Sequence, residues 1–153
     1  MQAVQTRTPP AAAVARPPVH LAVTPGDLRF LDLLAAYRTS GGLATGHEIS
    51  ARRPLDGLSA VARAVAAREV IVVDWGGQRW LPFFQFERGD VTVRQPVRAL
   101  LGELSGVLDD WDIAQWFVQP DAWLDGAQPL HLLATDFPRV HDAARALRFV
   151  CRN

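Results

Sequence analysis

The stretch Trp111–Phe149, WDIAQWFVQPDAWLDGAQPLHLLATDFPRVHDAARALRF, decides the fold of the C-terminal half of the chain. Its breaks fall at Pro120 and Gly126, and Pro129 can open a short helix because the first helical position does not need an N–H donor. The apolar spacing then predicts a last helix from about Pro138 to Val150. We therefore expect a small helical binding module in this half.

A further helix is expected just upstream, where apolar residues return to helical spacing after Pro96. The residues of this stripe are Val97, Leu100, Leu101, Leu104 and Leu108. The following carboxylates, Asp109, Asp110 and Asp112, lack the alternating oxygen ligands and the glycine of a calcium loop. They are better explained as N-terminal caps of a helix over Trp111–Val118.

Residues 69–94 predict a β-hairpin, because two β-rich runs flank Gly76 and Gly77, which can supply the positive φ angles of a two-residue turn. The register opposes Trp75 with Gln78, Asp74 with Arg79, Val73 with Trp80 and Val72 with Leu81. Because Pro82 cannot donate to a strand ladder, its strand should lie at a sheet edge or end its pairing there.

The N-terminal part predicts a Pro/Ala-rich flexible leader over residues 1–25 and a helical subdomain over residues 26–68. Asp27 is expected to cap a helix that carries an apolar stripe and stops at Gly41 and Gly42. The stripe consists of Leu28, Leu31, Leu34 and Ala35. Two more helices are predicted, over residues 44–51 and 56–67.

These last two helices could form a degenerate helix-turn-helix, although their connection is longer than the usual short link. On this reading Ser59 and Arg63 share one face of the recognition helix, and Arg52 and Arg53 lie near the DNA backbone. The alternative is a purely structural or dimerising subdomain.

Charge and cysteine content bear on partners and compartment. The net charge is zero, but residues 1–68 hold eight Arg against four acids, and residues 101–153 hold four Arg against eight acids. A basic front suits nucleic acid and an acidic back suits a basic protein, whereas two solvated surfaces are the plain alternative. With Cys151 as its single cysteine, the chain cannot form an internal disulfide and is unsuited to zinc, and no run is long and apolar enough for a membrane span. We expect a cytoplasmic protein.

No catalytic, metal or cofactor site is expected. The histidines His20, His47, His131 and His141 are not at metal-binding helical spacing, and the paired glycines lack the Lys-Ser/Thr of a phosphate loop.

Beyond these physical signals, the C-terminal half resembles the toxin-binding domain of Xre/MbcA/ParS-type antitoxins. That family's pattern is a Trp-containing helix, a Pro-Asn pair, Leu-x-Gly-x-x-Pro-Leu-x-Leu-Leu and an Ala-rich helix. It is matched by Trp116, Pro120, Leu124, Gly126, Pro129, Leu130, Leu132 and Leu133. Asp121 stands in place of the family's Asn. A hairpin motif upstream is matched by Trp80, Pro82, Gln85 and Phe86.

The resemblance implies a mainly α-helical fold: a helical N-terminal subdomain, one β-hairpin and a C-terminal toxin-binding domain over residues 95–153. It also implies a type II antitoxin that covers the active site of a RES-type, NAD-degrading toxin, represses its own operon through operator DNA and forms a homodimer. The residues expected to bind the toxin are Trp123, Arg145, Arg148, Arg152 and Asn153. Two alternatives stay open: a DNA-binding regulator without a toxin, and a stand-alone interaction module.

Overall fold

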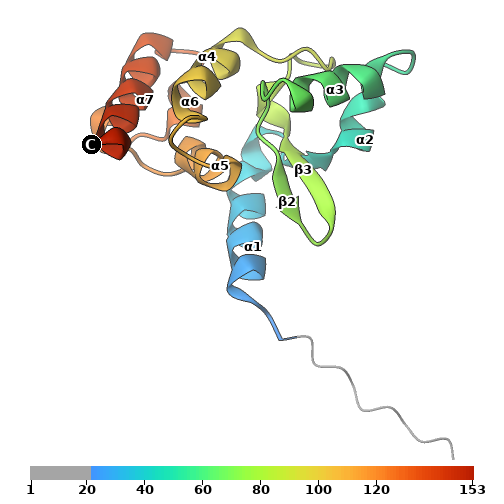
Figure 1. Cartoon of the computed structure of the whole chain (residues 1–153), viewed down its shortest axis with the longest axis horizontal. Helices are drawn as coiled ribbons and strands as arrows, with labels where there is room; N and C mark the ends of the chain where they lie inside the picture. The colour runs from blue at the N-terminus through green and yellow to red at the C-terminus, as the bar shows by residue number, and fades with distance from the viewer. Residues whose placement is uncertain (1–21) are drawn as a thin grey trace, which may run out of the picture.

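The computed structural model describes residues 22–153, and its fold is mainly α-helical with one small antiparallel sheet (Figure 1). In chain order the elements are α1 (Pro25–Tyr37), η1 (Arg38–Ser40), β1 (Leu43–Thr45), α2 (Gly46–Ser50), α3 (Gly57–Ala66), β2 (Val73–Trp75), β3 (Gln78–Pro82), η2 (Phe83–Gln85), α4 (Gln95–Leu104), α5 (Asp110–Val118), η3 (Ala122–Leu124), α6 (Pro129–Leu132) and α7 (Phe137–Arg152). Apart from its last four residues, the predicted leader lies outside the described part.

Helix α1 begins earlier than predicted, and Thr24 rather than Asp27 caps it. Thr24 Oγ1 accepts a hydrogen bond from the Asp27 N–H at 3.2 Å, and the Asp27 carboxylate accepts from the Thr24 N–H at 2.8 Å. This reciprocal pair is a capping box, with Pro25 at the first helical position. The predicted leader therefore runs one residue too far. The α-helix ends at Tyr37, four residues before the predicted stop, and η1 continues the helical turn to Ser40. Gly41, with a φ of 102°, then ends η1.

Helix α1 carries two apolar stripes, and the structure buries the aromatic one. Phe30 stacks on Trp75 with ring centroids 4.1 Å apart, and the buried Tyr37 hydroxyl donates to the Ala114 carbonyl at 2.6 Å. The leucine stripe faces outward, with Leu28 56% and Leu31 52% exposed.

The hairpin forms in the predicted register for the pairs Trp75–Gln78, Asp74–Arg79 and Val73–Trp80. Strand β2 begins at Val73, so the fourth predicted pair, Val72 with Leu81, is not part of the ladder. The Val72 N–H instead donates to an Asp110 carboxylate oxygen at 3.4 Å.

The helix predicted over residues 44–51 is wrong in its first part, because Leu43–Thr45 forms strand β1 and helix α2 covers only Gly46–Ser50. Strand β1 pairs with β3, so the strand order is β1-β3-β2 and β3 is the central strand, not an edge. Pro82 ends β3, which is the other outcome that its missing N–H allows.

The C-terminal half follows the sequence pattern closely. Helix α4 buries Val97, Leu100, Leu101 and Leu104, as its stripe predicts. Asp109 caps α5 by accepting from the Asp112 N–H at 2.8 Å. Helix α7 packs against α4, and Figure 1 shows α4 to α7 gathered on one side of the molecule, with the sheet, α2 and α3 on the other.

One hydrophobic core joins the two sides. The ring of Phe84 lies between Tyr37 of α1 and Phe117 of α5, with centroid distances of 5.6 and 4.9 Å. Gln85, fully buried, donates to the Ile71 carbonyl and accepts from the Ile71 N–H at 3.0 and 2.8 Å. It therefore satisfies a backbone segment that no strand pairs.

Over residues 22–153, every helix is too short or too polar to cross a lipid bilayer.

Candidate functional site

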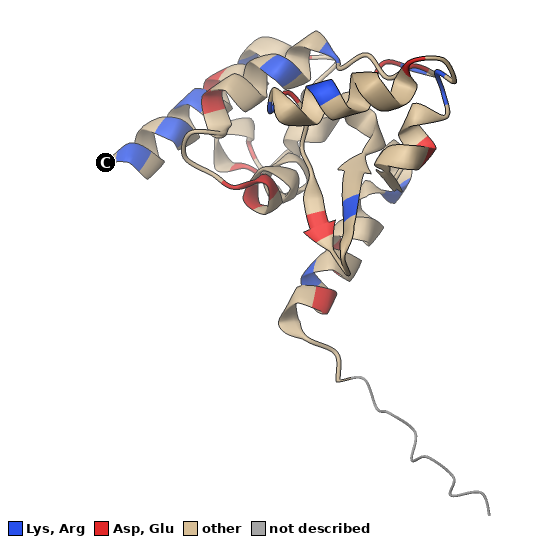
Figure 2. Ribbon diagram, turned by 45° about the vertical axis from the view of Figure 1, so that its right-hand side comes forward, with Lys and Arg blue, Asp and Glu red and all other residues tan. Residues whose placement is uncertain are grey.

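The C-terminal end of α7 borders a hollow of about 470 Å³. Its lining residues are Glu103, Arg145, Arg148, Phe149, Arg152 and Asn153. Four of these, all except Glu103 and Phe149, are residues predicted from the sequence to bind a toxin. We call Arg145, Arg148, Phe149, Arg152 and Asn153 the α7 end surface. Figure 2 shows Arg positions following α7 to its end.

Glu103 of α4 fixes one side of the α7 end surface. Its carboxylate accepts from Arg148 Nη1 at 2.7 Å and lies 3.7 Å from His141 Nε2. The hydrogen bond from Arg148 is the main reason that the pKa of Glu103 lies below its ordinary value of 4.5. Arg148 therefore ties α7 to α4, and its charge is largely balanced within the chain.

The other members of the α7 end surface lack such partners. Within residues 22–153, Arg145 and Arg152 form no ion pair. Beside them Phe149 is 70% and Val150 63% exposed, which leaves apolar area in water between two cations. Arginine next to an exposed aromatic ring is a composition enriched at protein interfaces.

Trp123 lies on η3, is 64% exposed and does not line this hollow. An ion pair between Asp125 and Arg139 holds η3 beside the N-terminal half of α7, whereas the arginines of the surface occupy its C-terminal half. The structure therefore brings the predicted arginines and Asn153 together, but leaves Trp123 apart from them.

Asp121, which stands where the antitoxin motif has Asn, is the N-cap of η3 and lies in the turn between α5 and η3. Its carboxylate accepts from Trp116 Nε1 at 2.9 Å and from the Trp123 N–H at 2.7 Å. This one side chain orients the buried Trp116 and starts the turn that displays Trp123. The motif predicts which position Asp121 occupies, but it does not predict the hydrogen bonds to Trp116 and Trp123.

The second candidate region is the α2–α3 unit, in which the two helices are joined by residues 51–56. The helices meet closely at Gly57, where an added Cβ would lie 2.2 Å from the Ser50 carbonyl oxygen. Only glycine fits this contact.

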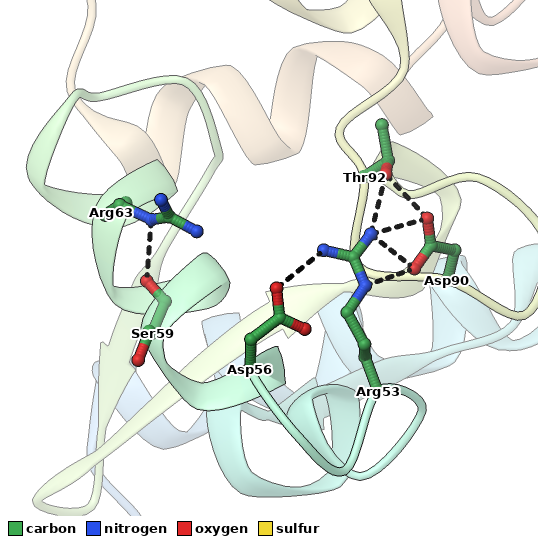
Figure 3. A network of polar contacts seen from close by, with 6 residues as sticks. All are labelled: Arg53, Asp56, Ser59, Arg63, Asp90 and Thr92. Atoms are coloured by element: carbon green, nitrogen blue, oxygen red, sulfur yellow. Dashed lines mark hydrogen bonds and ion pairs between the residues drawn. The ribbon is translucent and has the colours of Figure 1, made fainter.

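Figure 3 shows three of the four predicted DNA-binding residues, Arg53, Ser59 and Arg63. Ser59 and Arg63 lie together on α3, with Arg63 Nε donating to the Ser59 carbonyl at 3.3 Å, and both are exposed. Arg53 instead donates to Asp90 from Nε and Nη2 at 3.0 and 2.9 Å. Arg52 also points elsewhere, with its guanidinium 4.1 Å from the Phe83 ring centroid.

The histidines are dispersed, with His47 on α2, His131 on α6 and His141 beside Glu103. His20 lies outside the described residues.

In comparisons with known proteins, no family model, no curated protein and no solved structure matches this chain.

Proposed function

We propose that this chain is an antitoxin that inhibits a cognate toxin by binding it with the α7 end surface. The observation that carries the proposal is the uncovered end of α7, where Arg145, Phe149 and Arg152 are exposed and the two arginines form no ion pair with any residue of 22–153. Anchors of this kind contribute most of the binding free energy at protein interfaces.

The motif resemblance supports the choice of partner. Trp116, Leu124 and Pro129, which carry the resemblance, are all buried, so the motif maintains the shape of the C-terminal helices. The resemblance implies a toxin of the RES type, which degrades NAD. On this proposal the antitoxin works in the cytoplasm, covers the toxin's active site and needs no catalysis or cofactor of its own. Guanidinium groups suit a site built for the phosphates of a dinucleotide.

Co-expression of a RES-type toxin with antitoxin variants tests this proposal, with cell growth and cellular NAD as readouts. Removing a desolvated Arg or aromatic anchor costs about 2–4 kcal/mol, so Arg145→Glu with Phe149→Ala should weaken binding roughly 30- to 1,000-fold and release the toxin. Arg79→Glu makes the same charge change on the hairpin and should still protect the cells.

Trp123→Ala is tested separately, because Trp123 lies outside the α7 end surface. If the Trp123→Ala variant no longer protects cells from the toxin, the toxin-binding interface extends along α7 to η3. Full protection by the Arg145→Glu, Phe149→Ala variant would show that the α7 end surface is not the inhibitory one.

Operator binding through α3 is a second candidate function, and the element order favours it. Helices α2 and α3 are followed by a β-hairpin and lie beside a sheet of order β1-β3-β2. This order resembles that of a helix-turn-helix with a hairpin wing. The exposed face of α3 offers two polar side chains, Ser59 and Arg63, among exposed alanines and Leu58. Base contact would depend on Arg63.

Gel shifts with the gene's own upstream DNA test this second function. Arg63→Ala should weaken specific binding by about 1–3 kcal/mol and relax sequence preference, whereas Arg98→Ala on α4 should not. Equal binding by wild type and Arg63→Ala would exclude α3 as the reading helix.

We also propose that the protein forms a homodimer through the outer face of α1. Leu28, Leu31 and Leu34 are exposed along this face, and Leu31 and Leu34 also line a hollow of about 480 Å³ that extends to Gly41 and Leu43. An exposed apolar face of this kind can pack against the same face of a second copy, because a two-fold contact uses one surface patch twice.

A further inference from the structure

A second hollow, of about 830 Å³, lies where the segment after α1, the α2–α3 connection, η2, the turn at residues 87–89 and α6 meet. Its charged lining residues are Arg52, Arg88, Arg94 and Glu87. It shares no lining residue with the hollow at the end of α7. We call it the arginine hollow.

Two of its arginines are half-buried and held in place by uncharged groups. The Arg52 guanidinium lies over the Phe83 ring, and Arg94 Nη1 donates to the Phe84 carbonyl at 3.2 Å. These contacts orient the guanidinium groups but leave their charges unbalanced. Arg88 is exposed, and within residues 22–153 none of the three takes part in an ion pair.

Asp90, next to the turn at residues 87–89, and Asp56, in the α2–α3 connection, are ion-paired with a different arginine. Arg53 holds Asp90 at 2.8 Å and Asp56 at 3.6 Å (Figure 3). Hydrogen bonds from Thr92 and then Arg53 lower the pKa of Asp90 to about 2, so this carboxylate stays ionised and paired. On the wall itself, Arg52, Arg88 and Arg94 face one acid, Glu87, which leaves an excess of two positive charges.

We propose that the arginine hollow binds a phosphate-bearing small molecule of nucleotide size. Guanidinium forks match the oxygens of phosphate, and half-buried cations lacking an anion are stabilised when such a group enters. The volume falls within the range of roughly 300–1,000 Å³ typical of small-ligand sites. Leu130 of α6 also lines the hollow and adds apolar surface beside the guanidinium groups.

Isothermal titration of the full chain with pyrophosphate and with ATP, at low ionic strength, tests the proposal. Both ligands should bind, and binding should weaken as salt is raised. Arg88→Gln should weaken binding at least about tenfold, because one charge-assisted contact is lost. Arg88 is exposed and makes no ion pair in the part of the chain that the structure describes, so this variant should unfold at the same temperature as wild type.

Arg79→Gln is the matched control, since it removes one cation on the hairpin and should leave the affinity unchanged. Three results would overturn the proposal: no heat of binding at about 5 mM ligand, equal affinity of the Arg88→Gln and Arg79→Gln variants, or binding of duplex DNA that neither pyrophosphate nor ATP displaces. Arg88→Gln should still neutralise the toxin, so failure here and failure of the antitoxin proposal are distinguishable.

Discussion

At the residue scale, single side chains decide how neighbouring elements meet. Gly57 lets the start of α3 approach the Ser50 carbonyl, and Asp121 joins two tryptophans across a turn. Gln85 completes the hydrogen bonds of a buried backbone segment at Ile71. In each case a polar group or an absent side chain, rather than apolar area, determines the local geometry.

We predict that Gly57→Ala destabilises the protein by about 1–3 kcal/mol or more, because the new methyl group would overlap a backbone carbonyl that cannot move freely. Urea denaturation measures the change. Gly102→Ala is the control: Gly102 lies within α4 with open space around its Cβ position, so the same substitution should stabilise by about 0.5–1 kcal/mol. If Gly57→Ala leaves the free energy of unfolding unchanged, α2 and α3 are not packed this closely.

At the scale of elements, helix pairs are stabilised by burial and aligned by a few ion pairs. Helix α7 buries Val140, Ala143 and Ala144, and Glu103 of α4 holds its Arg148. Helix α1 is held to α5 in the same way, by Arg29 donating to Asp112 at 2.6 Å.

We predict that Glu103→Gln lowers the free energy of unfolding at neutral pH by up to about 1 kcal/mol. Because the folded-state pKa of Glu103 is lowered, its stabilisation is present above the unfolded value near 4.5 and is lost as pH falls through the folded value. The difference in free energy of unfolding between wild type and Glu103→Gln should therefore be smaller at about pH 3.5 than at neutral pH. Urea denaturation at the two pH values checks this.

Glu87→Gln supplies a control at an exposed glutamate without an ion pair among the described residues. If Glu103→Gln lowers the free energy of unfolding by the same amount at both pH values, the α4–α7 ion pair does not contribute to stability.

At the scale of the whole molecule, the N-terminal and C-terminal helices contribute to one hydrophobic core, whereas the outer face of α1 is exposed to solvent. Asp32 and Arg38, both exposed, form no ion pair within residues 22–153. An antiparallel pair of α1 helices centred on Ala35 would oppose Asp32 of one copy with Arg38 of the other. It would also bring each Leu28 toward the hollow beside Gly42.

We predict a dimeric mass by light scattering at tens of micromolar, and a monomer for Leu31→Asp, because a carboxylate would be desolvated in the contact. Asp32→Arg alone should weaken the dimer, and adding Arg38→Asp should restore it, since the exchanged charges again face each other. A monomeric wild type would rule out this contact, and a double variant no better than the single one would rule out its geometry.

Local signals in the sequence determined the starts of α5, α6 and α7 to within one residue, the hairpin register at Asp74 and Arg79, and the clustering of Arg145, Arg148 and Arg152. They did not determine that η3 is a 3-10 helix or that α7 continues to Arg152. Caps, turn glycines and apolar periods act within a few residues, so they can be read without the rest of the chain. Only the tertiary structure decided which stripe of α1 is buried, that β1 joins β3, and that Asp90 holds Arg53. Each of these outcomes depends on contacts between residues that lie far apart in the sequence. The local sequence allows either stripe of α1 to be buried and several acids to pair with Arg53, and packing and charge balance in the folded chain select one.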